Sequence, residues 1–247
     1  MNDKVLLVTG ASSDVGCALI RKVAANYKII WSHYCHSKNL IDELKNELGD
    51  VIIPIQADFS NVESTQQLIN TIIESGDMPD HIIHLSAPKT FNQRFHKCNW
   101  IDYQNNIDTS LRSIVMILKN LITSMSKQKY GKIIFMLTSY LTGVPPKFQS
   151  PYVTIKYALF GLMKNLAAEY SSKGIAVNAI SPDMMETKFL SNIPDIVIEQ
   201  NANSLPIGRN IKVDEVVSAF EYLLSDNADA IMGHNLAIGG GGTLLVN

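Results

Sequence analysis

Near the amino terminus the chain reads Val5-Leu6-Leu7-Val8-Thr9-Gly10-Ala11-Ser12-Ser13-Asp14-Val15-Gly16. The first residues form an apolar run of strand length, and a segment with helical periodicity follows at once. A glycine after the strand permits a tight turn, and small side chains then let the backbone approach a pyrophosphate at the helix amino terminus. We therefore predict a phosphate-binding turn over 10–16, although an ordinary strand-to-helix turn has the same local spacing.

The rest of the chain repeats this alternation. Apolar runs of strand length lie at 5–9, 29–33, 51–56, 81–86, 132–138, 175–181 and 236–238. Segments with apolar residues at helical spacing lie at 15–26, 39–48, 62–75, 102–127, 151–172 and 214–224. Ser60-Asn61-Val62-Glu63 has the form of a capping box, which predicts that Ser60 caps the third helix. Strands joined by helices predict an α/β fold with a doubly wound parallel sheet, covered by helices on both faces.

No linker, repeat or change of composition divides the sequence. We expect one domain over 1–247, which binds the dinucleotide and carries the catalytic residues. The irregular stretch at 186–212 holds Pro194 and Pro206. Long loops inside a compact domain are often lids or binding loops, so this stretch is expected to be a substrate-loop insertion above the sheet.

Composition excludes several classes of protein. Lys plus Arg number 21 against 23 Asp plus Glu, and this balance argues against a nucleic-acid binder. No apolar run approaches the roughly 20 residues of a membrane span, and no secretion signal is recognisable. The three cysteines are scattered and the six histidines lack ligand spacing, so neither a disulfide framework nor a metal site is expected. A cytoplasmic protein is the expectation.

Tyr152 and Lys156 share a helix face because they are four residues apart. A nearby ammonium lowers the pKa of a tyrosine, which makes the phenol a usable proton donor or acceptor. Tyr34 and Lys38 have the same spacing and are interpreted as a chance match. Ser139 closes a predicted strand at the edge where α/β sheets bind ligands, so it is placed to hydrogen-bond a substrate carbonyl. The alternative is a surface Tyr-Lys pair on an amphipathic helix.

These motifs together resemble the short-chain dehydrogenase/reductase family: Thr9 to Gly16, Asp58 after the third strand, and Ser139 with Tyr152 and Lys156. The stretches 178–187, 205–209 and 233–241 are similar to its 3-oxoacyl-carrier-protein-reductase-like members. The resemblance covers essentially the whole chain. It implies a Rossmann-type sheet of seven strands, a bound NAD or NADP, and hydride transfer between nicotinamide and a carbonyl or hydroxyl carbon.

The resemblance also implies roles for individual residues. Tyr152 is the general acid/base, Lys156 holds the cofactor ribose and lowers the Tyr152 pKa, and Ser139 orients the carbonyl oxygen. Ser110 aligns with the asparagine that relays protons in the family, with Asn105 and Asn106 as alternatives. The expected cofactor-binding residues are Gly10, Ser12, Ser13, Asp14, Val15, Gly16, His36, Ser37, Asp58, Phe59, Ser86, Ala87, Pro88, Tyr152, Lys156, Pro182, Asp183 and Thr187.

Three positions depart from the family pattern. Asp14 replaces the middle glycine of the phosphate turn, where a carboxylate repels pyrophosphate unless it points away. Leu85-Ser86-Ala87-Pro88 replaces Asn-Asn-Ala-Gly, and Pro88 removes a backbone donor. Ser110 replaces the relay asparagine. These changes leave an alternative open: a nucleotide-binding regulatory or scaffold protein of the same fold with little or no turnover.

The second strand is followed by His36, Ser37 and Lys38, with no carboxylate over 32–38. A carboxylate there binds the ribose of NAD, so NADP(H) is favoured over NAD(H), unless these residues merely begin the next helix with Ser37 as its cap.

The expected substrate is a small or carrier-linked carbonyl compound. Arg94 and Lys97 are candidates for contacting an anionic part of it, although a solvated charged loop is the commoner outcome. The helices over 102–127 and 151–172 carry more apolar residues than one buried face needs. In the family these helices form a subunit interface, so a homo-oligomer is expected, either a tetramer or a dimer. No nucleic-acid or membrane partner is expected.

Overall fold

A computed structural model describes residues 3–242 of the chain. Its strands form one parallel seven-stranded sheet in the order β3-β2-β1-β4-β5-β6-β7, which confirms the predicted fold. The strands are β1 Val5–Thr9, β2 Ile29–Tyr34, β3 Ile52–Gln56, β4 His81–His84, β5 Gly131–Met136, β6 Ile175–Pro182 and β7 Asn235–Ile238. The strand order reverses beside β1, where Val8 pairs with Ser32 of β2 on one side and Ile83 of β4 on the other. Open α/β sheets bind ligands at the carboxyl ends of the strands at such a reversal.

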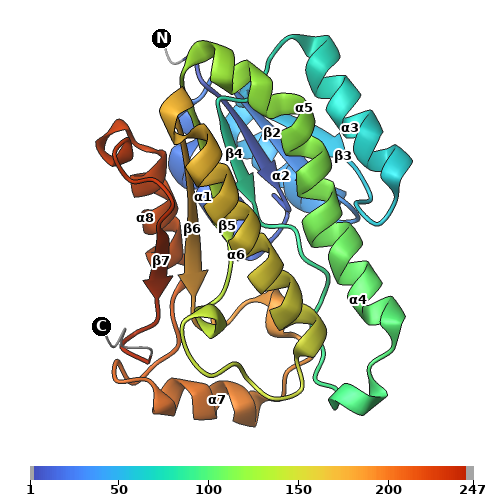
Figure 1. The fold of residues 1–247 in the computed structure, drawn as a ribbon, viewed down its shortest axis with the longest axis vertical. Coiled ribbons are helices and arrows are strands. Elements are labelled where there is room, and N and C mark those ends of the chain that lie inside the picture. Colours follow the sequence, from blue (N-terminus) through green and yellow to red (C-terminus); the bar gives the residue numbers. More distant parts are fainter. Residues whose placement is uncertain (1–2, 243–247) are drawn as a thin grey trace.

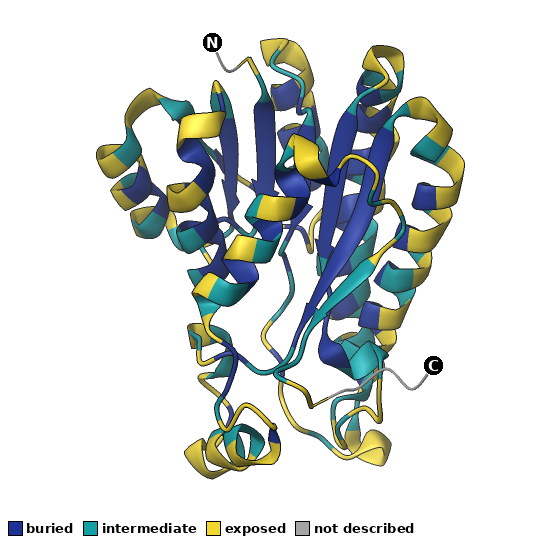
Figure 2. Cartoon of the chain, turned by 90° about the vertical axis from the view of Figure 1, so that its left-hand side faces the viewer, coloured by how far each residue is buried: buried dark blue, intermediate teal, exposed yellow. Residues whose placement is uncertain are grey.

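Two helical layers cover the sheet (Figures 1 and 2). The helices are α1 Asp14–Val23, α2 Lys38–Leu48, α3 Val62–Ser75, α4 Trp100–Asn106, α5 Ser113–Gln128, α6 Ser150–Tyr170, α7 Asp195–Ser204 and α8 Val213–Leu224. One buried apolar cluster joins α3, α5 and α6 to one face of the sheet, and a second joins α1, α2 and α8 to the other. Burial on both faces explains why most strands read as continuous apolar runs.

The amino end of α3 differs from the prediction. Asn61, not Ser60, is the capping residue, and its side-chain oxygen accepts a 2.8 Å hydrogen bond from the Ser64 backbone N–H. Ser60 instead donates from its hydroxyl to Asp58 Oδ1 at 2.7 Å. Asn and Ser are equally good caps, so this local sequence was consistent with either start.

The single helix predicted over 102–127 is divided into α4 and α5 by a π-helical turn at Ile107–Arg112. The backbone carbonyl of Ser110 accepts a 2.8 Å hydrogen bond from His84 Nε2. A side chain that hydrogen-bonds a backbone carbonyl, in competition with the regular hydrogen bonds of the helix, is a known cause of such turns. This hydrogen bond joins the π-helical turn to the end of β4.

The predicted insertion at 186–212 contains α7, which lies beyond the carboxyl ends of the strands (Figure 1). A short parallel bridge pairs Met185 with Ile211 and closes this segment at its base. No helix among residues 3–242 is long and apolar enough to cross a membrane.

Candidate active site

The turn after β1 is built as the sequence predicts. Gly10 has a φ of 70°, and a side chain there would meet the Ser86 backbone nitrogen at 3.1 Å. A Cβ on Gly16 would lie 2.5 Å from the Ala11 carbonyl oxygen, so both glycines are required by close packing. Ser13 caps α1 by accepting a 3.0 Å hydrogen bond from the Gly16 N–H. The turn therefore directs the amino end of α1 into the space beyond the sheet.

His33 supports this turn, a role that the sequence analysis missed. Its Nδ1 accepts a 3.0 Å hydrogen bond from the Gly10 N–H, so Nε2 carries the proton and donates to the Ala57 carbonyl. The ring stacks on Phe59 with centroids 4.0 Å apart. Burial lowers the pKa of His33 to about 4 and keeps the ring neutral. No local sequence signal distinguishes His33 from the other histidines, because its partners come from two segments distant in the sequence, at Gly10 and at 57–59.

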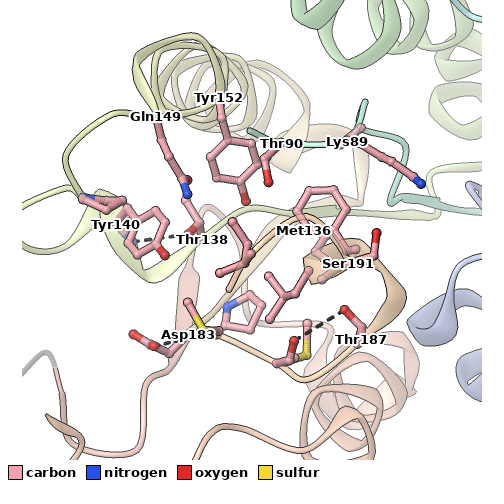
Figure 3. Close-up of a pocket in the computed structure, with 18 of the residues that line it drawn as sticks. Lys89, Thr90, Met136, Thr138, Tyr140, Gln149, Tyr152, Asp183, Thr187 and Ser191 are labelled. Atoms are coloured by element: carbon pink, nitrogen blue, oxygen red, sulfur yellow. Dashed lines mark hydrogen bonds between the residues drawn. The ribbon is translucent and has the colours of Figure 1, made fainter. Parts of the chain in front are cut away.

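A cavity of about 1070 Å³ is lined both by residues 12–15 of this turn and by Tyr152. Figure 3 shows the part of the cavity around Tyr152. It brings together many of the predicted residues. Those that line it are Ser12, Ser13, Asp14, Val15, Ser37, Ala87, Tyr152, Lys156, Pro182, Asp183 and Thr187. Segments far apart in the sequence thus meet at the carboxyl edge of the sheet, as the fold requires.

Nine other predicted residues are not among those that line the cavity. They are Gly10, Gly16, His36, Asp58, Phe59, Ser86, Pro88, Ser110 and Ser139. Gly10 and Gly16 shape the turn, and Phe59 is buried against His33. Tyr34 and Lys38 also lie outside the cavity, and Lys38 Nζ pairs with Asp42 at 2.8 Å. The second Tyr-Lys pair is therefore separate from the site, as predicted.

Tyr152 and Lys156 project from α6 on the same face. Lys156 Nζ lies 5.4 Å from the centroid of the Tyr152 ring and donates a 2.7 Å hydrogen bond to the Met136 carbonyl. Burial lowers the pKa of Lys156 to about 8. The pKa of Tyr152 is raised, chiefly by burial, which differs from the expected lowering by Lys156. Desolvation of the buried phenol is the largest cause of this shift and Tyr140 adds to it, so the protonated phenol is the stable form.

Ser139 takes a different position from the one expected. Its hydroxyl donates a 2.8 Å hydrogen bond to Asp183 Oδ2, and the side chain is buried away from the cavity. Thr138 lines the cavity, and its Oγ1 accepts a 3.4 Å hydrogen bond from the Tyr140 N–H. The spacing of thirteen residues to Tyr152 indicates Ser139 and gives no signal for Thr138.

The residues at this edge fit a dinucleotide. Ser86 Oγ is buried without a hydrogen-bond partner among the described residues. An ammonium has three donors, and Met136 is the hydrogen-bond acceptor identified for Lys156 Nζ, which leaves donors for ribose hydroxyls. Asp14 lines the cavity, but its Oδ2 accepts a 2.7 Å hydrogen bond from the Lys188 N–H and is partly neutralised there.

The fold and the cavity together define a dinucleotide-dependent oxidoreductase of the Rossmann type. A family model described as enoyl-(acyl carrier protein) reductase matches residues 10–243. The chain belongs to this family of short-chain dehydrogenases/reductases, and it is an NAD(P)-dependent oxidoreductase.

Particular relatives agree with this assignment. The chain is 29% identical to the 3-oxoacyl-acyl-carrier-protein reductase FabG of Buchnera aphidicola over 98% of both chains. It is 29% identical to the 3-oxoacyl-acyl-carrier-protein reductase of Synechocystis over 96% of both chains. A doubly substituted short-chain dehydrogenase/reductase of Serratia marcescens superposes with a TM-score of 0.89 at 22% identity, covering 98% of this chain and 99% of the other. This last likeness concerns the fold alone.

Proposed function

We propose that the protein is a carbonyl reductase that uses NADP(H), with Tyr152 as the proton donor and Lys156 as the ribose-binding cation. The observation that carries this proposal is the single cavity that joins the turn at 12–15 to Tyr152 and Lys156. Open α/β sheets bind their cofactors at this position, outside the carboxyl ends of the strands.

Tyr152 and Lys156 have different roles in the proposed proton transfer. Tyr152 keeps its proton in the closed site because burial raises its pKa, so it can donate to a carbonyl oxygen that gains negative charge. A bound nicotinamide dinucleotide supplies the hydride in this reaction. Lys156 holds ribose hydroxyls with its remaining donors, and its charge stabilises the phenolate left on Tyr152. Met184 and Phe189 help exclude water from the reacting end.

Preference for NADP(H) follows from the end of β2. Ser37 lines the cavity and His36 is exposed beside it, while no carboxylate occupies residues 32–38. Ser37 occupies the N-cap position of α2, but its side chain makes no capping hydrogen bond. Its hydroxyl is therefore available to a 2′-phosphate, and no acidic residue of this segment repels it. One nitrogen of the His36 ring pairs with Cys35 Sγ at 3.4 Å, and the other has no hydrogen-bond partner among the described residues.

The remaining proposals concern substrate, assembly and location. The FabG relatives are named for acyl-carrier-linked ketones, so a small or carrier-linked ketone is the proposed substrate. Exposed apolar side chains on α4 and α6, including Trp100, Ile101 and Tyr157, support a homo-oligomer, either a dimer or a tetramer. We also propose one domain over 1–247, of which 1–2 and 243–247 lie outside the described residues, and a cytoplasmic location.

Binding and turnover test this function separately. Calorimetric titration with NADPH and with NADH measures cofactor choice, and tighter NADPH binding is expected. Oxidation of NADPH in the presence of a short 3-oxoacyl thioester or another ketone then measures reduction. Tighter NADH binding would reverse the cofactor proposal, and binding without turnover on any ketone would favour the scaffold alternative.

A further inference from the structure

The backbone just before α6 takes a conformation that bulky residues rarely adopt. Phe148 has a φ of 72°, in the left-handed region that glycine favours. Lys129 is the other non-glycine residue with a positive φ among residues 3–242, and it ends α5, where the left-handed conformation is common. Phe148 ends no helix, since it directly precedes Gln149, the N-cap of α6. Its conformation therefore needs a separate explanation.

Two hydrogen bonds hold this part of the backbone in place. The Phe148 carbonyl accepts a 2.8 Å hydrogen bond from the Gln93 N–H. Beside it, Gln149 Nε2 donates a 3.0 Å hydrogen bond to Asn92 Oδ1. Two consecutive residues of the loop after β4 are thus paired with two consecutive residues of the segment before α6. Unfavourable backbone conformations persist where the surrounding structure imposes them, and they are common at sites that bind ligands.

Packing in the core does not account for Phe148. The residue is 47% exposed, so much of its apolar surface remains in water. Phe148 also lines the cavity, which places its ring where the cavity opens to solvent. The result of the unfavourable backbone conformation is therefore an aromatic ring held at this opening.

Other apolar side chains line the same cavity. Val144 and Pro146 belong to the same segment as Phe148. Phe189 comes from the segment after β6, and its ring centroid lies 6.2 Å from that of Tyr152. A ketone whose oxygen meets Tyr152 can thus place an apolar substituent against side chains of both segments.

We propose that Phe148 is a specificity-determining residue, whose ring contacts the apolar substituent of the ketone at the opening of the cavity. This inference rests on the proposed reductase activity. The ring gives a preference for a ketone with a long alkyl substituent over an equally reactive ketone with a short one. Because the ring acts on the substituent and not on the carbonyl group, it strengthens binding and leaves the chemical step unchanged.

Two substrates that differ only in chain length test this preference. With NADPH, Phe148→Ala should lower kcat/KM for 3-oxooctanoyl N-acetylcysteamine at least about tenfold through a higher KM, and should change the value for the 3-oxobutanoyl compound little. Phe148→Leu should retain most of the preference. Phe95→Ala is the matched control and should retain all of it, since Phe95 is 75% exposed and is not among the residues that line the cavity. An equal effect of Phe148→Ala on both substrates, or a loss in kcat alone, would overturn the proposal.

Binding without turnover separates this inference from the proposed function. Octanoyl and butanoyl N-acetylcysteamine lack the ketone, and each is titrated calorimetrically into the protein in the presence of NADPH. The wild-type protein should bind the octanoyl compound more tightly, and Phe148→Ala should lose this advantage. Equal binding of the two compounds by the wild type, or an advantage that persists in Phe148→Ala, rejects the role of Phe148 even if ketones are reduced. Selective binding that depends on Phe148, without reduction of any ketone, supports that role and rejects the reductase activity.

Thermal unfolding tests the backbone conformation. Phe148→Gly and Phe148→Ala both lack the ring, but only glycine adopts a φ of 72° without cost. Phe148→Gly should therefore have a Tm about 2–4 °C higher than that of Phe148→Ala. A Tm for Phe148→Gly equal to or below that of Phe148→Ala would show that the backbone is not strained, and would remove the reason for assigning a function to the ring.

Discussion

Asp14 on the phosphate turn accepts a 2.7 Å hydrogen bond from the backbone N–H of Lys188, which lies 174 positions later in the sequence. The carboxylate thus ties the amino end of α1 to the segment that follows β6. Both residues line the cavity. The carboxylate expected to repel a cofactor therefore also joins two segments that border the cavity.

Removal of the Asp14 charge should strengthen dinucleotide binding. Asp14→Asn retains an oxygen for the Lys188 N–H but removes the repulsion of the pyrophosphate, so NADPH should bind about tenfold more tightly, or about 1.4 kcal/mol. Calorimetric titration at two salt concentrations measures this. The advantage over wild type should shrink in high salt, because salt screens the repulsion. Equal affinities at low salt would show that the carboxylate does not repel the cofactor.

Tyr152 should be essential for turnover and dispensable for cofactor binding. Loss of the proton donor in Tyr152→Phe should lower kcat by about 100- to 10,000-fold. The Kd for NADPH should change little, because the ring and Lys156 remain. Tyr34→Phe is the matched control, since Tyr34 has the same spacing to a lysine but lies outside the cavity. Equal rates for Tyr152→Phe and Tyr34→Phe would refute the assignment.

Lys156 should set the alkaline limit of the reaction. Its pKa is lowered to about 8, so in the free enzyme the ammonium is charged below that pH and neutral above it. Since the charge stabilises the phenolate, kcat/KM for reduction should be level at lower pH and decline above about pH 8. A pH profile of initial rates measures this. The arginine of Lys156→Arg stays charged, so the decline of kcat/KM above about pH 8 should disappear in this variant. A decline that persists in Lys156→Arg would be due to another group.

His33 should make the fold sensitive to mild acid. Its pKa is lowered to about 4 from an ordinary 6.5, so the unfolded state binds the proton first. The contribution of neutral His33 to the free energy of unfolding is fully present above pH 6.5. It decreases as the pH falls towards 4, by at most about 3 kcal/mol. Urea unfolding of wild type and His33→Gln across this range tests it. His81 and His84 shift in the same direction, so His33→Gln should flatten the dependence only in part.

Local sequence patterns were sufficient for the alternation of strands and helices and for the turn at Gly10. Apolar runs and helical spacing report burial directly, and a glycine with positive φ reports a backbone shape. The same local reasoning misplaced the cap of α3 at Ser60. It also missed the π-helical turn at Ser110, because that turn involves a hydrogen bond from His84 of β4, which is distant in the sequence.

The chain order of residues thus determined the parallel sheet, the edge at which the site lies and the pairing of Tyr152 with Lys156. Tertiary structure decided which carboxylate accepts from the Ser139 hydroxyl, where the Asp14 carboxylate points and which histidine supports the turn after β1. The Ser139 hydroxyl, for example, donates to Asp183, which lies 44 positions later in the sequence. These contacts depend on burial and on hydrogen bonds between segments that are distant in the sequence. Short-range periodicity cannot predict either of them.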